Sequence, residues 1–63
     1  MLKTIYAIPA PYAPAMIEVY GDPDFACYEW RLVGQDGELL QDTESQAYGS
    51  AEIALRDALI ACS

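Results

Sequence analysis

Residues Phe25–Leu40, FACYEWRLVGQDGELL, contain two apolar runs joined by a turn signal. In the first run every second residue is large and apolar, which is the period of a β-strand with one buried face. These residues are Tyr28, Trp30 and Leu32. The pair Asp36-Gly37 tolerates a positive φ at low steric cost, so the chain can reverse there in a tight turn. The stretch therefore predicts a β-hairpin whose aromatic face belongs to the core.

Another strand precedes this hairpin. Ile17 and Val19 share one face of the segment MIEVY at positions 16–20, while the residues between them share the other face. The turn residues of Gly21–Asp24 end the strand, and this short connection makes the two strands antiparallel neighbours. The run after the hairpin turn reaches Leu40, and the polar segment Gln41–Ala47 is expected to be a loop. These patterns predict a three-stranded antiparallel meander.

The C-terminal segment carries the signals of one α-helix. Ser50 suits the N-cap, and Glu52 places a carboxylate at the positive end of the helix dipole. Between Ala51 and Ala61 the inner arc is mostly alanine, so the helix can approach the sheet closely and leave the core volume to the larger side chains of the sheet. The predicted core residues are Ile17, Val19, Tyr28, Trp30, Leu32 and Leu55.

The N-terminal region has mixed signals. Lys3–Ile8, KTIYAI, favours a short peripheral strand, whereas the prolines at positions 9, 11 and 14 remove backbone donors and favour an extended path. We therefore predict an N-terminal arm or short extra strand at residues 1–14, followed by a single ββ-β-α domain at residues 15–63. The predicted fold class is α+β, a three-stranded antiparallel meander sheet packed by one C-terminal helix.

The charge balance argues against several classes of partner. The formal net charge is −7, because ten acidic residues face only Lys3, Arg31 and Arg56. So few cations cannot neutralise a phosphate backbone, and anionic lipids would repel the chain, so we expect no direct binding to nucleic acid and none to a membrane. No run approaches the ~20 apolar residues of a membrane span, and the N-terminus lacks the apolar core of a signal peptide. Cys27 and Cys62 are then expected to be reduced in a cytoplasmic protein, and the alternatives are a bridge between the two or an interchain link.

The residue types argue against catalysis. The chain contains no histidine, which excludes imidazole base catalysis, Cys–His nucleophile pairs and histidine-bearing metal sites. Paired-carboxylate catalysis needs two carboxyl groups in a concave, partly desolvated site, and one helix on a small sheet offers little concavity. Asp22, Asp24 and Asp36 occur in turn sequences, where aspartate suits the backbone. We therefore expect a protein that is not an enzyme and has no metal or cofactor site.

Four short signals follow one another along the chain. They are Ile17-Glu18-Val19, Tyr28-x-Trp30-x-Leu32, Asp36-Gly37-Glu38, and Tyr48-x-Ser50 with Ala54. Their order and spacing between Ile17 and Ala61 resemble the YegP-like small domain of bacteria. The resemblance implies a strand-strand-strand-helix unit without assigned activity, often duplicated or paired, and these positions are structural ones. The segment from Glu38 to Tyr48 is longer here, and the proline-bearing N-terminus has no counterpart in the family pattern.

Two groups of apolar residues have no predicted cover. Ile53 and Ile60 project together from the helix on the side away from its alanine arc, and Met16, Tyr20 and Val33 lie on the sheet face away from the helix. We expect a non-enzymatic interaction or assembly domain, in the form of a homodimer. Edge pairing, packing of open faces or docking of the N-terminal arm on a second chain would each bury these residues. The alternative, prompted by the net charge, is a small acidic inhibitor that mimics nucleic acid in the basic groove of a partner protein.

Overall fold

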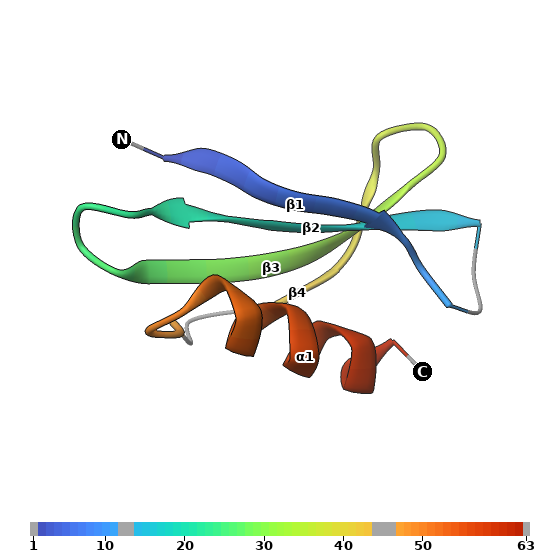
Figure 1. Cartoon of the computed structure of the whole chain (residues 1–63). Coiled ribbons are helices and arrows are strands. Elements are labelled where there is room, and N and C mark those ends of the chain that lie inside the picture. The colour runs from blue at the N-terminus through green and yellow to red at the C-terminus, as the bar shows by residue number, and fades with distance from the viewer. Residues whose placement is uncertain (1, 12–13, 44–46, 63) are drawn as a thin grey trace.

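The computed structural model describes residues 2–11, 14–43 and 47–62. Its elements are β1 (Lys3–Pro9), β2 (Ala15–Asp22), β3 (Cys27–Gly34), β4 (Leu39–Asp42) and α1 (Ala51–Ala61). The strands form one antiparallel sheet in the order β1-β2-β3-β4, and α1 packs on one face of it (Figure 1). The predicted α+β class and the C-terminal helix are confirmed.

The prediction of three strands is wrong, because the sheet has four. The additional strand is β1, which runs along β2 from Lys3 opposite Gly21 to Pro9 opposite Met16. Pro9 is tolerated because β1 is an outer strand, where a missing N–H removes no bond from the interior of the sheet. Half of the region predicted as an arm or short extra strand, Lys3–Pro9, is therefore a strand paired within its own chain.

The centre of the core lies between β2, β3 and α1. Ile17 and Val19 have 0% of their surface exposed, and Trp30 and Leu32 have 4% and 9%. Val19 lies opposite Trp30 and Ile17 opposite Leu32, and cross-strand neighbours share a face, so these four side chains pack as one group. Partly buried side chains surround them: Ile5, Tyr6, Ile8, Tyr28, Tyr48, Leu55 and Leu59.

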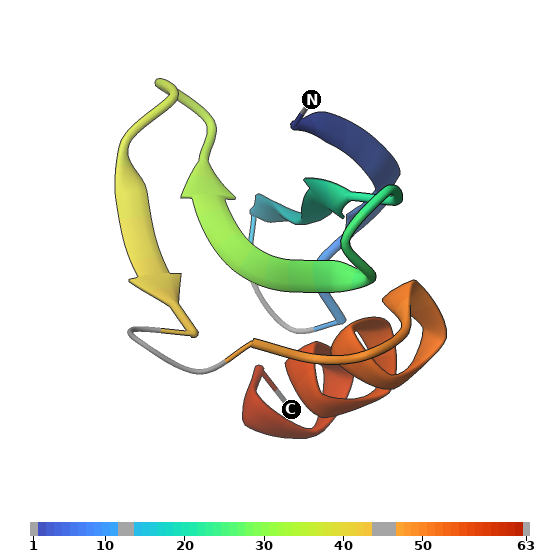
Figure 2. The same cartoon turned by 90° about the vertical axis from the view of Figure 1, so that its left-hand side faces the viewer.

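Helix α1 packs on the sheet through alanines. Its buried residues are Ala51, Ala54 and Ala58, whose short side chains let the helix lie close to β1, β2 and β3. Ser50 caps the helix as predicted, because its hydroxyl accepts a hydrogen bond from the Ile53 N–H at 3.1 Å. Within the described residues α1 makes no contact with β4, and Figure 2 shows β4 standing away from the helix.

The turn between β3 and β4 is closed by two backbone hydrogen bonds. The Gly37 N–H donates to the Gly34 carbonyl at 3.0 Å, and the Gly34 N–H donates to the Glu38 carbonyl at 2.8 Å. Gly37 has a φ of 83°, as the sequence predicts, whereas Asp36 does not adopt a positive φ. The connection is therefore a three-residue loop that ends in a glycine bulge.

A bulge in β1 sets the direction of Tyr6. The register of β1 on β2 shifts at Ile5, so that Tyr6 lies opposite Val19 on the helix side of the sheet. There its hydroxyl donates a hydrogen bond to Glu52 Oε2 at 3.0 Å. This hydrogen bond, together with the negative charge of Glu52, raises the pKa of Tyr6. The contact connects α1 to the outer strand.

The pairing of β3 continues beyond the end of β4. The Trp30 N–H donates to Thr43 Oγ1 at 2.9 Å, and the Thr43 hydroxyl donates to the Trp30 carbonyl at 2.8 Å. Tyr28 and Tyr48 then exchange two backbone hydrogen bonds of 3.0 and 2.8 Å. The segment expected as a loop, Gln41–Ala47, thus begins with the end of β4 and with Thr43, while residues 44–46 lie outside the described part of the chain.

Candidate interaction surfaces

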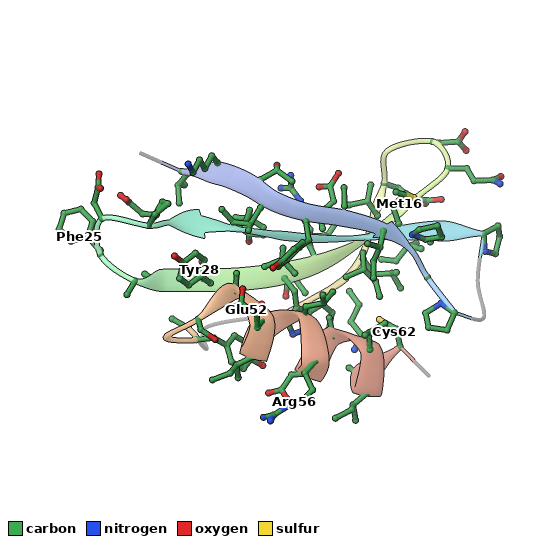
Figure 3. The ribbon with its side chains drawn as sticks, in the orientation of Figure 1. Met16, Phe25, Tyr28, Glu52, Arg56 and Cys62 are labelled. Atoms are coloured by element: carbon green, nitrogen blue, oxygen red, sulfur yellow. The ribbon has the colours of Figure 1, made fainter. Side chains whose placement is uncertain are left out.

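The open face of the sheet, on the side away from α1, is arranged in rows that cross the strands. One row runs over all four strands through cross-strand neighbours, and we call it the apolar band: Pro9, Met16, Val33 and Leu39. Met16 is 39% exposed and Leu39 is 59% exposed. Figure 3 shows Met16 on the side of the sheet opposite α1. The band therefore exposes apolar side chains at one end of the open face.

An open hollow adjoins the apolar band. It has a volume of about 260 Å³, and its lining residues are Pro9, Pro14, Ala15, Met16, Gly34 and Gln35. The two prolines give this hollow a stiff wall without backbone donors. Its lining suits an apolar side chain better than a charged group.

The next row of the open face is charged. Glu18, Arg31 and Asp42 are cross-strand neighbours, and Arg31 Nε lies 2.7 Å from Glu18 Oε1. The guanidinium also stacks over the Tyr20 ring at 4.8 Å from its centroid. Burial raises the pKa of Tyr20, and the charge of nearby Glu29 adds to this effect. This part of the face therefore carries more carboxylates than cations.

Helix α1 presents a second uncovered surface, which we call the outer stripe: Ile53, Arg56, Asp57 and Ile60. Ile53 is 43% exposed and Ile60 is 66% exposed. Arg56 Nε lies 3.5 Å from Asp57 Oδ1, in a pair that is open to solvent. Figure 3 shows Arg56 pointing away from the sheet. The outer stripe therefore combines two apolar side chains with one charge of each sign.

Four of the five residues predicted to form an interface lie on these two surfaces. Met16 and Val33 are neighbours in the apolar band, and Tyr20 shares the open face but lies two rows away, against Arg31. The other two, Ile53 and Ile60, belong to the outer stripe. The predicted residues therefore form two separate surfaces on opposite sides of the molecule.

Sequence reasoning missed Pro9 and Leu39, which complete the apolar band. The sequence indicates either an arm or a strand at Pro9, so it does not define the neighbour of Pro9 on β2. Leu39 faces the open side because the register of β4 shifts at Leu40, and the pair Leu39-Leu40 does not indicate which of the two residues is the extra one. The apolar run after the turn was the available signal for β4, but it fixes no register.

The polar and ionisable side chains of the described residues lie at or near the surface. None of the polar or charged side chains there is fully buried, and no three His, Cys, Asp or Glu residues in these ranges are placed to share a metal ion. Trp30 Nε1 is buried without a hydrogen-bond partner in the described chain, but an indole N–H neither ionises nor attacks a substrate. Burial raises the pKa of the Cys62 thiol, which lowers its reactive thiolate fraction. No helix within the described ranges is long and apolar enough to cross a membrane.

The chain matches no protein-family model, no curated protein and no solved structure. The resemblance to the YegP-like domain stays a prediction, and the function is inferred from the apolar band and the outer stripe.

Proposed function

We propose that this protein is a non-enzymatic assembly domain that works as a homodimer. The observation that carries the proposal is the distribution of the exposed apolar side chains. Of the seven large apolar residues that are exposed in the described chain, Met16 and Leu39 belong to the apolar band and Ile53 and Ile60 to the outer stripe, whereas single exposed apolar residues are normal on a monomer. Apolar side chains that are grouped in this way, with charged residues beside them, are typical of protein interfaces.

The size of the domain supports the same proposal. A chain of 63 residues buries only ~60% of the surface that its unfolded form exposes. Contact with a second copy would bury more of its apolar surface. Twofold closure is the commonest way in which soluble chains associate. The chain requires no second gene product to cover its own apolar surface in this arrangement.

The charged groups support a binding role. The carboxylates of the described chain are all at least partly exposed, so water screens them and no pair is held in the desolvated setting that acid–base catalysis uses. Cys27 and Cys62 are both free thiols, which suits a reducing compartment. We therefore propose a cytoplasmic location and self-association as the function.

Sedimentation equilibrium tests this proposal directly. The expected result is a mass that rises from the 6.9 kDa monomer toward twice that value as the protein concentration increases. The measurement is made at low and at high salt, because an apolar contact survives screening whereas a purely ionic one weakens. A monomer mass at every concentration up to about 1 mM would contradict the proposal.

A second candidate is a small acidic inhibitor that fills a basic groove of a nucleic-acid-binding protein. The observation that favours it is the excess of carboxylates on the open face, where Glu18, Glu29 and Asp42 lie around Arg31. Such a complex should weaken steeply as salt rises. Capture of a basic protein at low salt that is lost at high salt, together with a monomeric free chain, would favour this candidate over the homodimer.

A further inference from the structure

We propose that the homodimer forms through α1, with the two helices antiparallel about a twofold axis that passes between Arg56 and Asp57. In this arrangement Ile53 packs on Ile60 of the second copy, and Arg56 pairs with Asp57 of the second copy. The inference rests on the proposed homodimer and names the surface and the register of its contact.

The spacing of the outer stripe is that of a helix–helix contact. Its four residues occupy positions i, i+3, i+4 and i+7 of α1, which form one line along a helix. The buried positions Ala51, Ala54 and Ala58 lie on the sheet side, so the stripe faces away from the domain. A second helix can therefore pack along it without displacing any element of the fold.

Twofold symmetry makes the outer stripe complementary to itself. In an isologous contact, residue i of one copy meets residue j of the other, and j meets i in return. Ile53 and Ile60 are equally far from the midpoint between Arg56 and Asp57, so one antiparallel register brings isoleucine to isoleucine and arginine to aspartate together. In a parallel pair, Arg56 would instead face Arg56 of the second copy, and Asp57 would face Asp57 of the second copy.

Charge also selects the outer stripe over the open face as the contact. On the open face, Glu18, Glu29 and Asp42 outnumber Arg31, which is already bound to Glu18. Packing of two open faces would bring like charges together, which is costly at an interface and adds to the −7 on each chain. The outer stripe has no net charge, so its self-contact avoids this repulsion.

The expected contact is a weak one. Two helices of 11 residues that touch along one side bury less than the ~1,200 Å² of a standard stable interface. We therefore expect a dimer whose population depends on concentration in the micromolar range and above. Added salt should preserve or strengthen it, because salt screens the mutual repulsion of two acidic chains.

A charge exchange with rescue tests the contact and its register. Arg56→Glu and Asp57→Lys, made singly, each replace two ion pairs of the dimer by two repulsive contacts and should raise the dimer dissociation constant about tenfold or more. The double variant restores an opposite charge at each position and should return the constant to within about threefold of the unsubstituted chain. Dispersed amide spectra of all three variants show that the fold is retained.

Variants of the open face provide the matched controls. Glu29→Lys changes the net charge by the same amount as Asp57→Lys but lies on β3, and Met16→Glu places a charge in the apolar band. Both should leave the α1 dimer intact, and Glu29→Lys should strengthen it slightly by lowering the net charge. Sedimentation equilibrium on the same concentration series compares all the variants.

Cysteine cross-linking tests the antiparallel register independently. With Cys27 and Cys62 replaced by serine, a chain carrying Ile53→Cys should form a disulfide with a chain carrying Ile60→Cys when the two are mixed and oxidised. Neither chain should cross-link to its own copy, because the two equivalent positions would be about 10 Å apart along the helix axes. Cross-linking of each chain to itself instead would contradict the register.

The outcomes separate this inference from the proposed function. If the chain is monomeric at every concentration, the proposed homodimer itself is contradicted. A chain that dimerises normally in both single charge variants but fails to do so in Met16→Glu keeps the homodimer and moves its contact to the open face, which overturns the inference about α1.

Discussion

The side chain of Thr43 makes hydrogen bonds to the backbone of β3. In a regular strand, backbone groups would make these bonds. The Thr43 hydroxyl accepts a hydrogen bond from the Trp30 N–H and donates one to the Trp30 carbonyl, while the Thr43 N–H also donates to that carbonyl. Trp30 is the largest residue of the buried core. The hydrogen bonds of Thr43 therefore fix the backbone position of the side chain that fills the most core volume. A polar residue in an aperiodic segment gives no sequence signal for this role.

Thr43→Val should therefore lower the free energy of unfolding by about 1–2 kcal/mol, because it keeps the side-chain shape but leaves the part-buried Trp30 N–H without its acceptor. Urea denaturation measures the change. Thr4→Val is the matched control, since Thr4 is exposed on β1 and its loss should change the stability by no more than ~0.5 kcal/mol. Equal effects of the two substitutions would contradict the role given to Thr43.

Among the elements, the four strands show which parts of the fold follow from the sequence. The alternation of large apolar residues indicates correctly which residues of β2 and β3 face the helix, because the period of a strand is fixed by its backbone. The bulges at Ile5 and Leu40 carry no such signal. They depend on how two strands fit each other over their length, and the apolar band and the Tyr6–Glu52 contact depend on them in turn.

In the β3–β4 hairpin, the free-energy cost of the positive φ in the turn can be measured separately from side-chain contacts. Gly37 has a φ of 83°, and a Cβ added there would meet nothing within 4 Å, so only the backbone opposes a side chain. Gly37→Ala should lower the free energy of unfolding by about 1 kcal/mol. Gly49 has the same open surroundings without a positive φ, so Gly49→Ala should be neutral or slightly stabilising. Loss of stability in both variants to the same extent would contradict this account.

At the scale of the whole molecule, the core is small. Its largest completely buried side chains are those of Ile17 and Val19, and the helix contributes mainly alanines. The indole of Trp30 therefore supplies much of the remaining core volume. The sequence predicts this division between a sheet of large side chains and a helix of small ones. It also indicates Met16, Ile53 and Ile60 as apolar residues without cover, and all three are exposed, whereas the exposure of Leu39 on the open face depends on the bulge at Leu40.

Trp30→Ala should abolish the folded state. Removing a buried indole costs ~3–5 kcal/mol, which is comparable to the total stability that one hydrophobic core gives a domain of this size. Loss of amide dispersion in the NMR spectrum is the expected result. Phe25→Ala is the matched control, because Phe25 is 80% exposed at the tip of the β2–β3 connection and its removal should leave the spectrum dispersed. A dispersed spectrum from Trp30→Ala would show that the indole is not central to the core.

The stability of the whole molecule should fall at alkaline pH. Tyr6, Tyr20 and Cys62 all have raised pKa values in the folded protein, through the hydrogen bond to Glu52 for Tyr6 and through burial for the other two. The unfolded chain therefore loses these protons first, near the ordinary pKa values of 9.0 for the thiol and 10.0 for the phenols. Their contribution to stability is complete below the lower of these values and is lost as the pH rises through the folded pKa values.

Urea denaturation at a fixed protein concentration between pH 7 and pH 11 measures this decline. The free energy of unfolding should be flat up to about pH 8 and should then fall. Tyr6→Phe removes both the ionisable group and its hydrogen bond to Glu52, so this variant should start from a lower stability at pH 7 and decline less steeply above pH 9. An unchanged slope in Tyr6→Phe would show that the Tyr6–Glu52 hydrogen bond does not couple β1 to α1 in solution, and the alkaline decline would then belong to Tyr20 and Cys62 alone.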